Sequence, residues 1–262
     1  MLVKRFFWPV LLFSVLGLVS CGKKQGDKTG PSVSGQSSES LPEDTEERYK
    51  VVYVKAAQAF SRNNLDEALK YLELADQAKP NQASNANLRG AIYTRKRDWT
   101  NAELSFRNAL LLQPDLPMAQ FNLGEVLFLS NKYGEAREKF QIFLNSQPKN
   151  DLGIYKIYLC DLLGGNKAKA DDFLSSLEPS PNSPLYYFAK AAEAFHRGDK
   201  PAGMEFVGSA YRIYPGDANS TFADSLVEKG YLSGEQSVPP VEENKKPKIE
   251  ELKTLLPETK KN

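Results

Sequence analysis

The sequence contains few of the residues from which catalytic and metal sites are usually built. Its 262 residues include one histidine, His196, and two cysteines, Cys21 and Cys160. A single imidazole excludes any site that requires two histidines, and two cysteines are too few for a disulfide framework or a Cys-based zinc site. The sequence also has no H-E-x-x-H, G-x-S-x-G, C-x-x-C or dinucleotide-binding glycine motif. We therefore expect no enzymatic activity, no cofactor and no metal.

Neither sign of charge is in excess. The chain has 34 Lys and Arg residues against 33 Asp and Glu residues, for a formal net charge of +1. Acidic and basic residues are interspersed, whereas nucleic-acid-binding proteins usually gather Lys and Arg on one face. The composition, 41% hydrophobic and 26% charged, suits a folded globular protein. It gives no reason to expect a nucleic-acid partner.

The N-terminus lacks a hydrophobic run long enough to cross a membrane comfortably. Residues 6–19 form an apolar run of 14 residues, whereas a spanning helix needs about 20. Lys4 and Arg5 precede this run, and small residues followed by a polar segment come after it. This order is typical of a secretory signal peptide.

The signal segment ends on Leu18-Val19-Ser20-Cys21, which resembles the lipobox of bacterial lipoprotein precursors. The resemblance implies a signal peptide over residues 1–20, cleavage before Cys21, and lipid attachment to Cys21, including acyl chains such as palmitate. A thiolate is nucleophilic enough to take the lipid near neutral pH. The resemblance also implies the bacterial cell envelope, and Gly22 after the cysteine favours the outer membrane, facing the periplasm. The alternative is an ordinary signal anchor with an incidental cysteine.

Two polar segments flank the rest of the chain. Residues 21–45 are rich in Gly, Ser, Lys, Gln and Pro and predict a flexible tether, with a reach of roughly 25 Å. Residues 234–262 are rich in Glu, Lys and Pro and predict a disordered tail. Within the tail, Ile249 to Leu256 places apolar side chains on one helical face. That segment either has no role or docks on the folded domain.

Between these segments, four sets of residues recur at an interval of 34. They are Pro80, Pro114 and Pro148; Ala68, Ala102 and Ala136; Leu72, Phe106 and Phe140; and Ala56, Gly90 and Gly124. A fixed interval of this length indicates stacked repeats, and the apolar spacing inside each repeat is helical. In the third repeat, Asn131 and Lys132 separate two helices, and Pro148 ends the pair.

This pattern resembles the tetratricopeptide repeat. Residues 49–82, 83–116 and 117–150 match it well, while residues 151–183 and 184–217 are weaker copies. A closing helix over about 220–231 follows. We therefore predict an all-α superhelix over residues 46–233, made of about five helix-turn-helix repeats and the closing helix.

In this family, the first helix of each repeat lines the concave face. At the N-terminal end that face would be mixed, with Lys50, Tyr53, Asn87 and Arg95. From the third repeat onward it would be apolar, and six residues are predicted to bind a protein or peptide partner there: Phe121, Phe128, Tyr155, Leu159, Phe188 and Phe195. The alternatives are that tight superhelical coiling buries part of this stripe, or that residues 249–256 occupy it.

Together these resemblances imply a membrane-anchored envelope lipoprotein that binds a protein as a scaffold or assembly factor. Pilotin-like and outer-membrane assembly lipoproteins share the architecture, which is an analogy at the level of the fold. The second candidate function is a role in polysaccharide export, which would favour exposed aromatic residues beside carboxylates, such as Tyr53, Tyr155 and Glu125. A hydrolytic enzyme is the least favoured.

Overall fold

The computed structural model describes residues 44–233, and within that range the chain forms eleven α-helices and no β-strand. The helices are α1 (Thr45–Ser61), α2 (Leu65–Ala78), α3 (Ala83–Arg95), α4 (Trp99–Leu112), α5 (Pro117–Leu129), α6 (Tyr133–Ser146), α7 (Asp151–Leu163), α8 (Lys167–Ser176), α9 (Leu185–His196), α10 (Lys200–Ile213) and α11 (Gly216–Glu228). The predicted signal peptide, all but the last two residues of the predicted tether, and the predicted tail lie outside the described residues.

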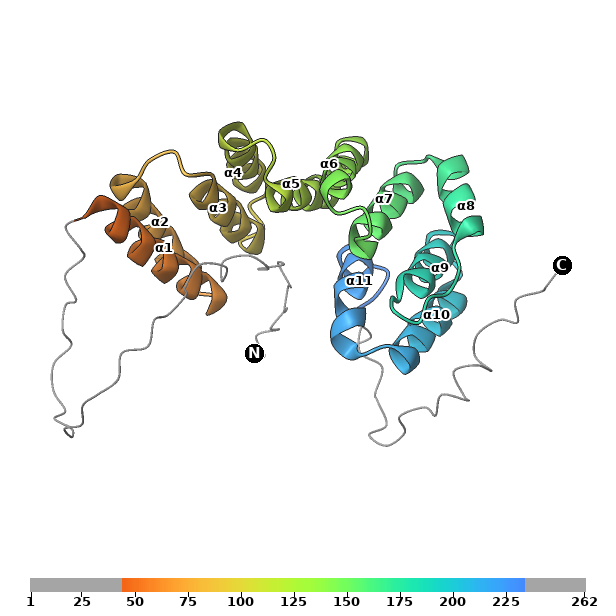
Figure 1. The fold of residues 1–262 in the computed structure, drawn as a ribbon. Helices are drawn as coiled ribbons and strands as arrows, with labels where there is room; N and C mark the ends of the chain where they lie inside the picture. Colours follow the sequence, from red (N-terminus) through yellow and green to blue (C-terminus); the bar gives the residue numbers. More distant parts are fainter. Residues whose placement is uncertain (1–43, 234–262) are drawn as a thin grey trace, which may run out of the picture.

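The first ten helices form five antiparallel pairs that stack side by side into a curved superhelix (Figure 1). The eleventh, α11, contacts α7, α9 and α10 and lies on the inner side of the curve. The predicted all-α superhelix of five repeats and a closing helix is thus confirmed. The closing helix begins at Gly216, four residues earlier than predicted, because Pro215 precedes its first turn and does not interrupt it.

The same backbone conformation forms the turn between the two helices of every pair. The residue at the same place of each repeat has a positive φ, in the left-handed region that glycine and asparagine adopt at least cost. These residues are Asn63 (63°), Arg97 (58°), Asn131 (61°), Gly165 (82°) and Gly198 (87°). The left-handed residue ends the first helix and returns the chain antiparallel to it. Arg97 is the one member of this set that is neither Asn nor Gly.

Small residues hold the paired helices close together. A Cβ atom added to Gly90 would stand 2.6 Å from the ring of Phe106, and one added to Gly124 would stand 2.7 Å from the ring of Phe140. In the fifth pair the roles are reversed, because a Cβ atom added to Gly203 on α10 would stand 2.5 Å from the ring of Phe195 on α9. The aromatic ring therefore fills the space that a glycine leaves on the opposite helix.

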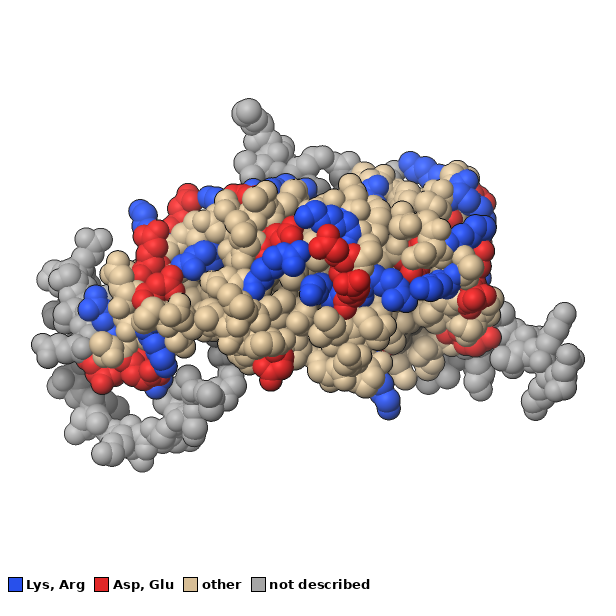
Figure 2. Space-filling view, turned by 90° about the horizontal axis from the view of Figure 1, so that it is seen from above, with Lys and Arg blue, Asp and Glu red and all other residues tan. Residues whose placement is uncertain are grey.

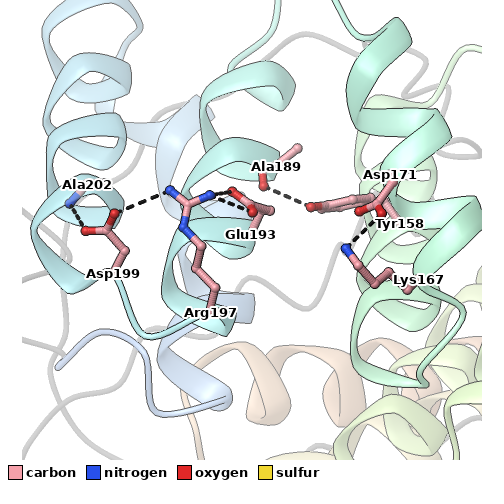
Figure 3. Close-up of polar contacts among 8 residues, drawn as sticks. All are labelled: Tyr158, Lys167, Asp171, Ala189, Glu193, Arg197, Asp199 and Ala202. Atoms are coloured by element: carbon pink, nitrogen blue, oxygen red, sulfur yellow. Dashed lines mark hydrogen bonds and ion pairs between the residues drawn. The ribbon is translucent and has the colours of Figure 1, made fainter.

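One polar contact joins the two weaker repeats in addition to packing, and others lie within them (Figure 3). The Tyr158 hydroxyl on α7 donates to the carbonyl oxygen of Ala189 on α9 at 3.2 Å. Near the next turn, Arg197 donates to Glu193 at 2.7 Å and to Asp199 at 3.3 Å. Asp199 also accepts a hydrogen bond from a backbone N–H in the first turn of α10 and so caps that helix.

Acidic and basic side chains are interspersed over the face that Figure 2 shows. Ion pairs also bridge the second helices of neighbouring repeats: Arg107 on α4 lies 2.8 Å from Glu103 of its own helix and 3.0 Å from Glu135 on α6. Since charges of both signs alternate on this face, it has no field of one sign to attract a polyanion.

Candidate binding groove

The six residues predicted to form an exposed apolar groove are buried. Their exposed fractions are 4% for Phe121, 0% for Phe128, 0% for Tyr155, 1% for Leu159, 0% for Phe188 and 7% for Phe195. The prediction that they present an exposed surface is therefore wrong. The alternative, that tight superhelical coiling buries part of this stripe, is right about the burial, to which the closing helix α11 contributes. That a partner binds these six residues stays a prediction.

The apolar face of α11 covers much of this stripe. The ring of Phe222 lies 5.2 Å from the ring of Tyr155 on α7 and stacks on the ring of Phe188 on α9 at 5.7 Å. The start of α11 is held in place by Asn219, whose side-chain amide donates to the carbonyl oxygens of Tyr214 at 2.9 Å and Pro215 at 3.1 Å. The C-terminal half of the concave face is thereby filled by the chain itself.

The other end of α11 is anchored as well. Lys229 donates to the carbonyl oxygen of Phe128 at 2.8 Å, and its ammonium group lies 4.2 Å from the centre of the Phe128 ring. The ring of Tyr231 stacks on that of Phe195 at 5.7 Å. Burial, together with the neighbouring positive charge of Lys156, lowers the pKa of Lys229 to about 8. The closing helix thus reaches from the fifth repeat back to the third.

The N-terminal half of the concave face keeps polar side chains within reach of a ligand. Asn122 on α5 donates to the side-chain oxygen of Asn87 on α3 at 3.3 Å, and both residues are half-buried. Arg95 stacks on the ring of Phe60 at 3.7 Å, and burial lowers the pKa of its guanidinium. Tyr53 is half-buried on α1, and burial raises its pKa to about 12. These groups offer amide donors and acceptors, a cation and an aromatic ring.

Where the two halves meet, a cavity of about 40 Å³ lies between α3, α5, α7 and α11. Its lining includes Glu125 and Lys156, which form an ion pair of 2.8 Å between α5 and α7. From α11 it includes Thr221, Asp224, Ser225 and Glu228, which share one side of that helix. The side of α11 opposite its apolar face therefore becomes a wall of the remaining groove.

The acids of α11 are held in an unfavourable environment for a charge. Burial raises the pKa of Asp224 to about 6, and it also raises the pKa of Glu228. Arg97 compensates Glu228 in part, since its guanidinium lies 3.3 Å from that carboxylate. This ion pair joins the turn of the second repeat to the last helix. Asp224 has no ion pair within the described part of the chain.

Sequence reasoning missed these α11 residues. A signal was present, because positions 221, 224, 225 and 228 recur at helical spacing and are all polar. A polar stripe normally indicates solvent, so the pattern alone does not show that it faces a groove.

The two cysteines stand apart. Cys21, the predicted lipid-attachment residue, lies outside the described residues. Cys160 is buried on α7, and burial raises the pKa of its thiol to about 12, which keeps it protonated.

Between residues 44 and 233, acids, His196 and Cys160 form no group of three that could hold a metal ion. The helices in that range are also too short or too polar to span a bilayer.

A scan against protein-family models and a search of curated protein sequences gave no match. Several solved structures have a similar fold. PilW, described as a widely conserved type IV pilus biogenesis factor, is 19% identical with a TM-score of 0.53, over 72% of this chain and 88% of PilW. PilF of Pseudomonas aeruginosa is 15% identical with a TM-score of 0.52, over 71% of this chain and 88% of PilF. YrrB, described as a TPR protein with an unusual peptide-binding site, is 16% identical with a TM-score of 0.50, over 66% of this chain and 89% of YrrB.

Proposed function

We propose that this chain, a tetratricopeptide-repeat protein, is an envelope lipoprotein anchored through Cys21 that binds a protein partner as a scaffold or assembly factor. The partner lies on the N-terminal half of the concave face, around Tyr53, Asn87 and Asn122. The observation that carries this proposal is the division of the groove: α11 fills its C-terminal half, whereas the N-terminal half keeps half-buried polar and aromatic side chains.

The kind of partner follows from these groups. Side-chain amides such as Asn87 and Asn122 can donate to and accept from the main chain of an extended peptide. Arg95 can pair with a carboxylate of the partner, because its ring-stacked guanidinium keeps a fixed orientation. The surface suits a saccharide less well. Tyr155, one of the aromatic residues that a saccharide site would need exposed, is fully buried. A protein or peptide therefore suits the surface better than a glycan.

The relatives by fold support the assembly role in a general way. PilW is described as a pilus biogenesis factor, and YrrB as a protein with a peptide-binding site. At identities of 19% and 16% the likeness concerns the fold, so a pilus or any other particular assembly is not proposed here.

Anchoring is tested with a Cys21→Ala variant produced in a bacterium that processes lipoproteins. We expect the variant to accumulate at precursor length and to incorporate no labelled fatty acid, because the thiolate that accepts the lipid is gone. A Cys160→Ala variant is the matched control and should be labelled like the wild type. Labelling that persists in Cys21→Ala would refute the anchor.

The groove is tested by comparing proteins that co-purify from detergent-solubilised envelopes with two double variants. Asn87→Arg with Asn122→Arg places bulk and charge on the concave face. Asn108→Arg with Asn145→Arg makes the same change at exposed positions of the second helices α4 and α6. A partner that is lost with the first variant and kept with the second supports the proposal. A partner kept with both would place the binding surface elsewhere.

A further inference from the structure

Around the cavity beside α11 lie residues with three buried oxygen atoms that have no hydrogen-bond partner among the described residues. They are Oε1 of Glu125, Oδ2 of Asp224 and Oγ of Ser225, and all three residues line the same cavity. Ser225 is only 2% exposed. A buried polar atom that is not hydrogen-bonded costs free energy, so three such atoms around one cavity indicate a place where donors are expected.

We propose that this cavity is a subsite for a primary ammonium group, namely the side chain of a lysine in the partner. The inference rests on the proposed function, because the lysine would extend from a chain bound on the neighbouring half of the groove. An ammonium group carries three donors and no acceptor, and the cavity offers three acceptors without a partner.

The size of the cavity fits this ligand. A cavity needs a volume of roughly 10–15 Å³ to hold one water-sized group, and this cavity has a volume of about 40 Å³. A compact ammonium group on a flexible stem can enter such a space. The broad, planar guanidinium group of arginine presents five donors in a fixed fork and suits it less well.

The charges around the cavity also favour a cation. Three acids line it, Glu125 from α5 and Asp224 and Glu228 from α11, together with one base, Lys156 from α7. Lys156 is bonded to Glu125, and Glu228 is bonded to Arg97 at the rim. Asp224 is left as the carboxylate to which a further cation can bind.

The pKa of Asp224, raised to about 6 by burial, gives the subsite a pH dependence. Lys156 lowers this pKa, whereas Glu228 and Glu125 raise it. Tyr211 on α10 also faces Asp224, and burial together with the charge of Asp224 raises the pKa of its phenol. Lys229, directly after α11, lies near Glu228 and Glu125. Since the ammonium group pairs with the ionised carboxylate, binding should weaken as the pH falls below 6.

The test uses the full mature chain and two five-residue peptides with blocked ends. The first is acetyl-Ala-Ala-Lys-Ala-Ala-amide, and the second carries Nε-acetyl-lysine at the centre. We expect the first peptide to cause saturable NMR shifts of the backbone amides of residues 221–228. The acetylated peptide should bind at least tenfold more weakly, and so should the first peptide at pH 5 compared with pH 7.5.

Two variants provide the matched comparison. Asp224→Asn should weaken binding of the lysine peptide at least tenfold, and Asp217→Asn should leave it unchanged, since Asp217 is exposed in the first turn of the same helix. Equal shifts from the two peptides, or no saturable shift at millimolar concentration, would overturn the subsite. If the lysine peptide fails while an envelope partner still depends on Asn87 and Asn122, the ammonium subsite is refuted and the proposed function stands.

Discussion

The close approach of paired helices predicts that one methyl group has opposite effects at two glycines of the third repeat. At Gly124 an added Cβ would stand 2.7, 2.9 and 3.0 Å from three ring carbons of Phe140. That ring is fully buried and packs against Phe121 with 5.3 Å between ring centres, so it cannot rotate away without displacing its neighbours. At Gly134, in the first turn of α6, an added Cβ would meet no atom within 4 Å.

The magnitudes follow from two competing terms. Replacing glycine by alanine inside a helix stabilises by roughly 0.5–1 kcal/mol, and this term applies to both positions, although less at a helix end. Overpacking costs about 1–3 kcal/mol and applies to Gly124 alone. We therefore expect Gly124→Ala to be less stable than Gly134→Ala by about 1–3 kcal/mol, because the backbone term largely cancels in the comparison and the overpacking term does not.

The assay is unfolding in urea, monitored by the circular dichroism signal of the helices. The two variants are compared provided that their free energies of unfolding depend equally on urea concentration. Gly90→Ala repeats the experiment in the second repeat, where the added Cβ would stand 2.6 Å from Phe106. A Gly124→Ala variant as stable as Gly134→Ala would refute the reasoning, since it would mean that the helices separate at no cost.

Three further predictions follow from buried groups. Cys160 should resist alkylation at pH 8 in the folded Cys21→Ala variant, where it is the remaining thiol, and react after unfolding in urea, because burial raises its pKa to about 12; rapid labelling of that folded variant would contradict this. Lys156→Met should destabilise by on the order of 3 kcal/mol, because it leaves Glu125 without its partner, and Glu125→Leu in the same chain should recover most of the loss of urea midpoint. The pKa of Asp224 rises from 3.8 to about 6 on folding, so its carboxyl group makes the folded wild type less stable as the pH rises through that range. Asp224→Asn lacks this effect and should gain stability over the wild type between pH 4 and pH 7. A difference in free energy of unfolding that stays constant across that range would refute the prediction.

Much of the fold could be predicted because its information is local. The interval of 34 residues places a small residue opposite an aromatic one in the second and third repeats, and the structure pairs Gly90 with Phe106 and Gly124 with Phe140 as that interval requires. The turns could be placed for the same reason, since Asn131 and Gly165 are residues that adopt the left-handed conformation. Each repeat contacts mainly its neighbours, so one period contains most of what determines the next.

The candidate site could not be predicted in the same way, because it depends on contacts outside the repeat. The apolar stripe at Phe128, Tyr155 and Phe188 is compatible with a groove for a partner and with a buried core. The packing of α11 on this stripe makes it part of the core. The helix and Lys229 after it contact residues about 30 to 100 positions away in the sequence, such as Phe188 and Phe128. Helical periodicity shows that α11 has an apolar face but not which surface that face covers.

The position of α11 gives one helix two roles that constrain each other. Its apolar face, with Phe222 against Tyr155 and Phe188, encloses aromatic surface that would otherwise be exposed. Its opposite face brings Asp224 into a cavity where burial raises the pKa of the carboxyl group to about 6. Packing energy therefore holds in place a carboxylate whose burial costs stability. A residue chosen for stability alone would be apolar or amide-bearing, and Asp224, an acid without an ion pair among residues 44–233, stands where the proposed ammonium group would bind.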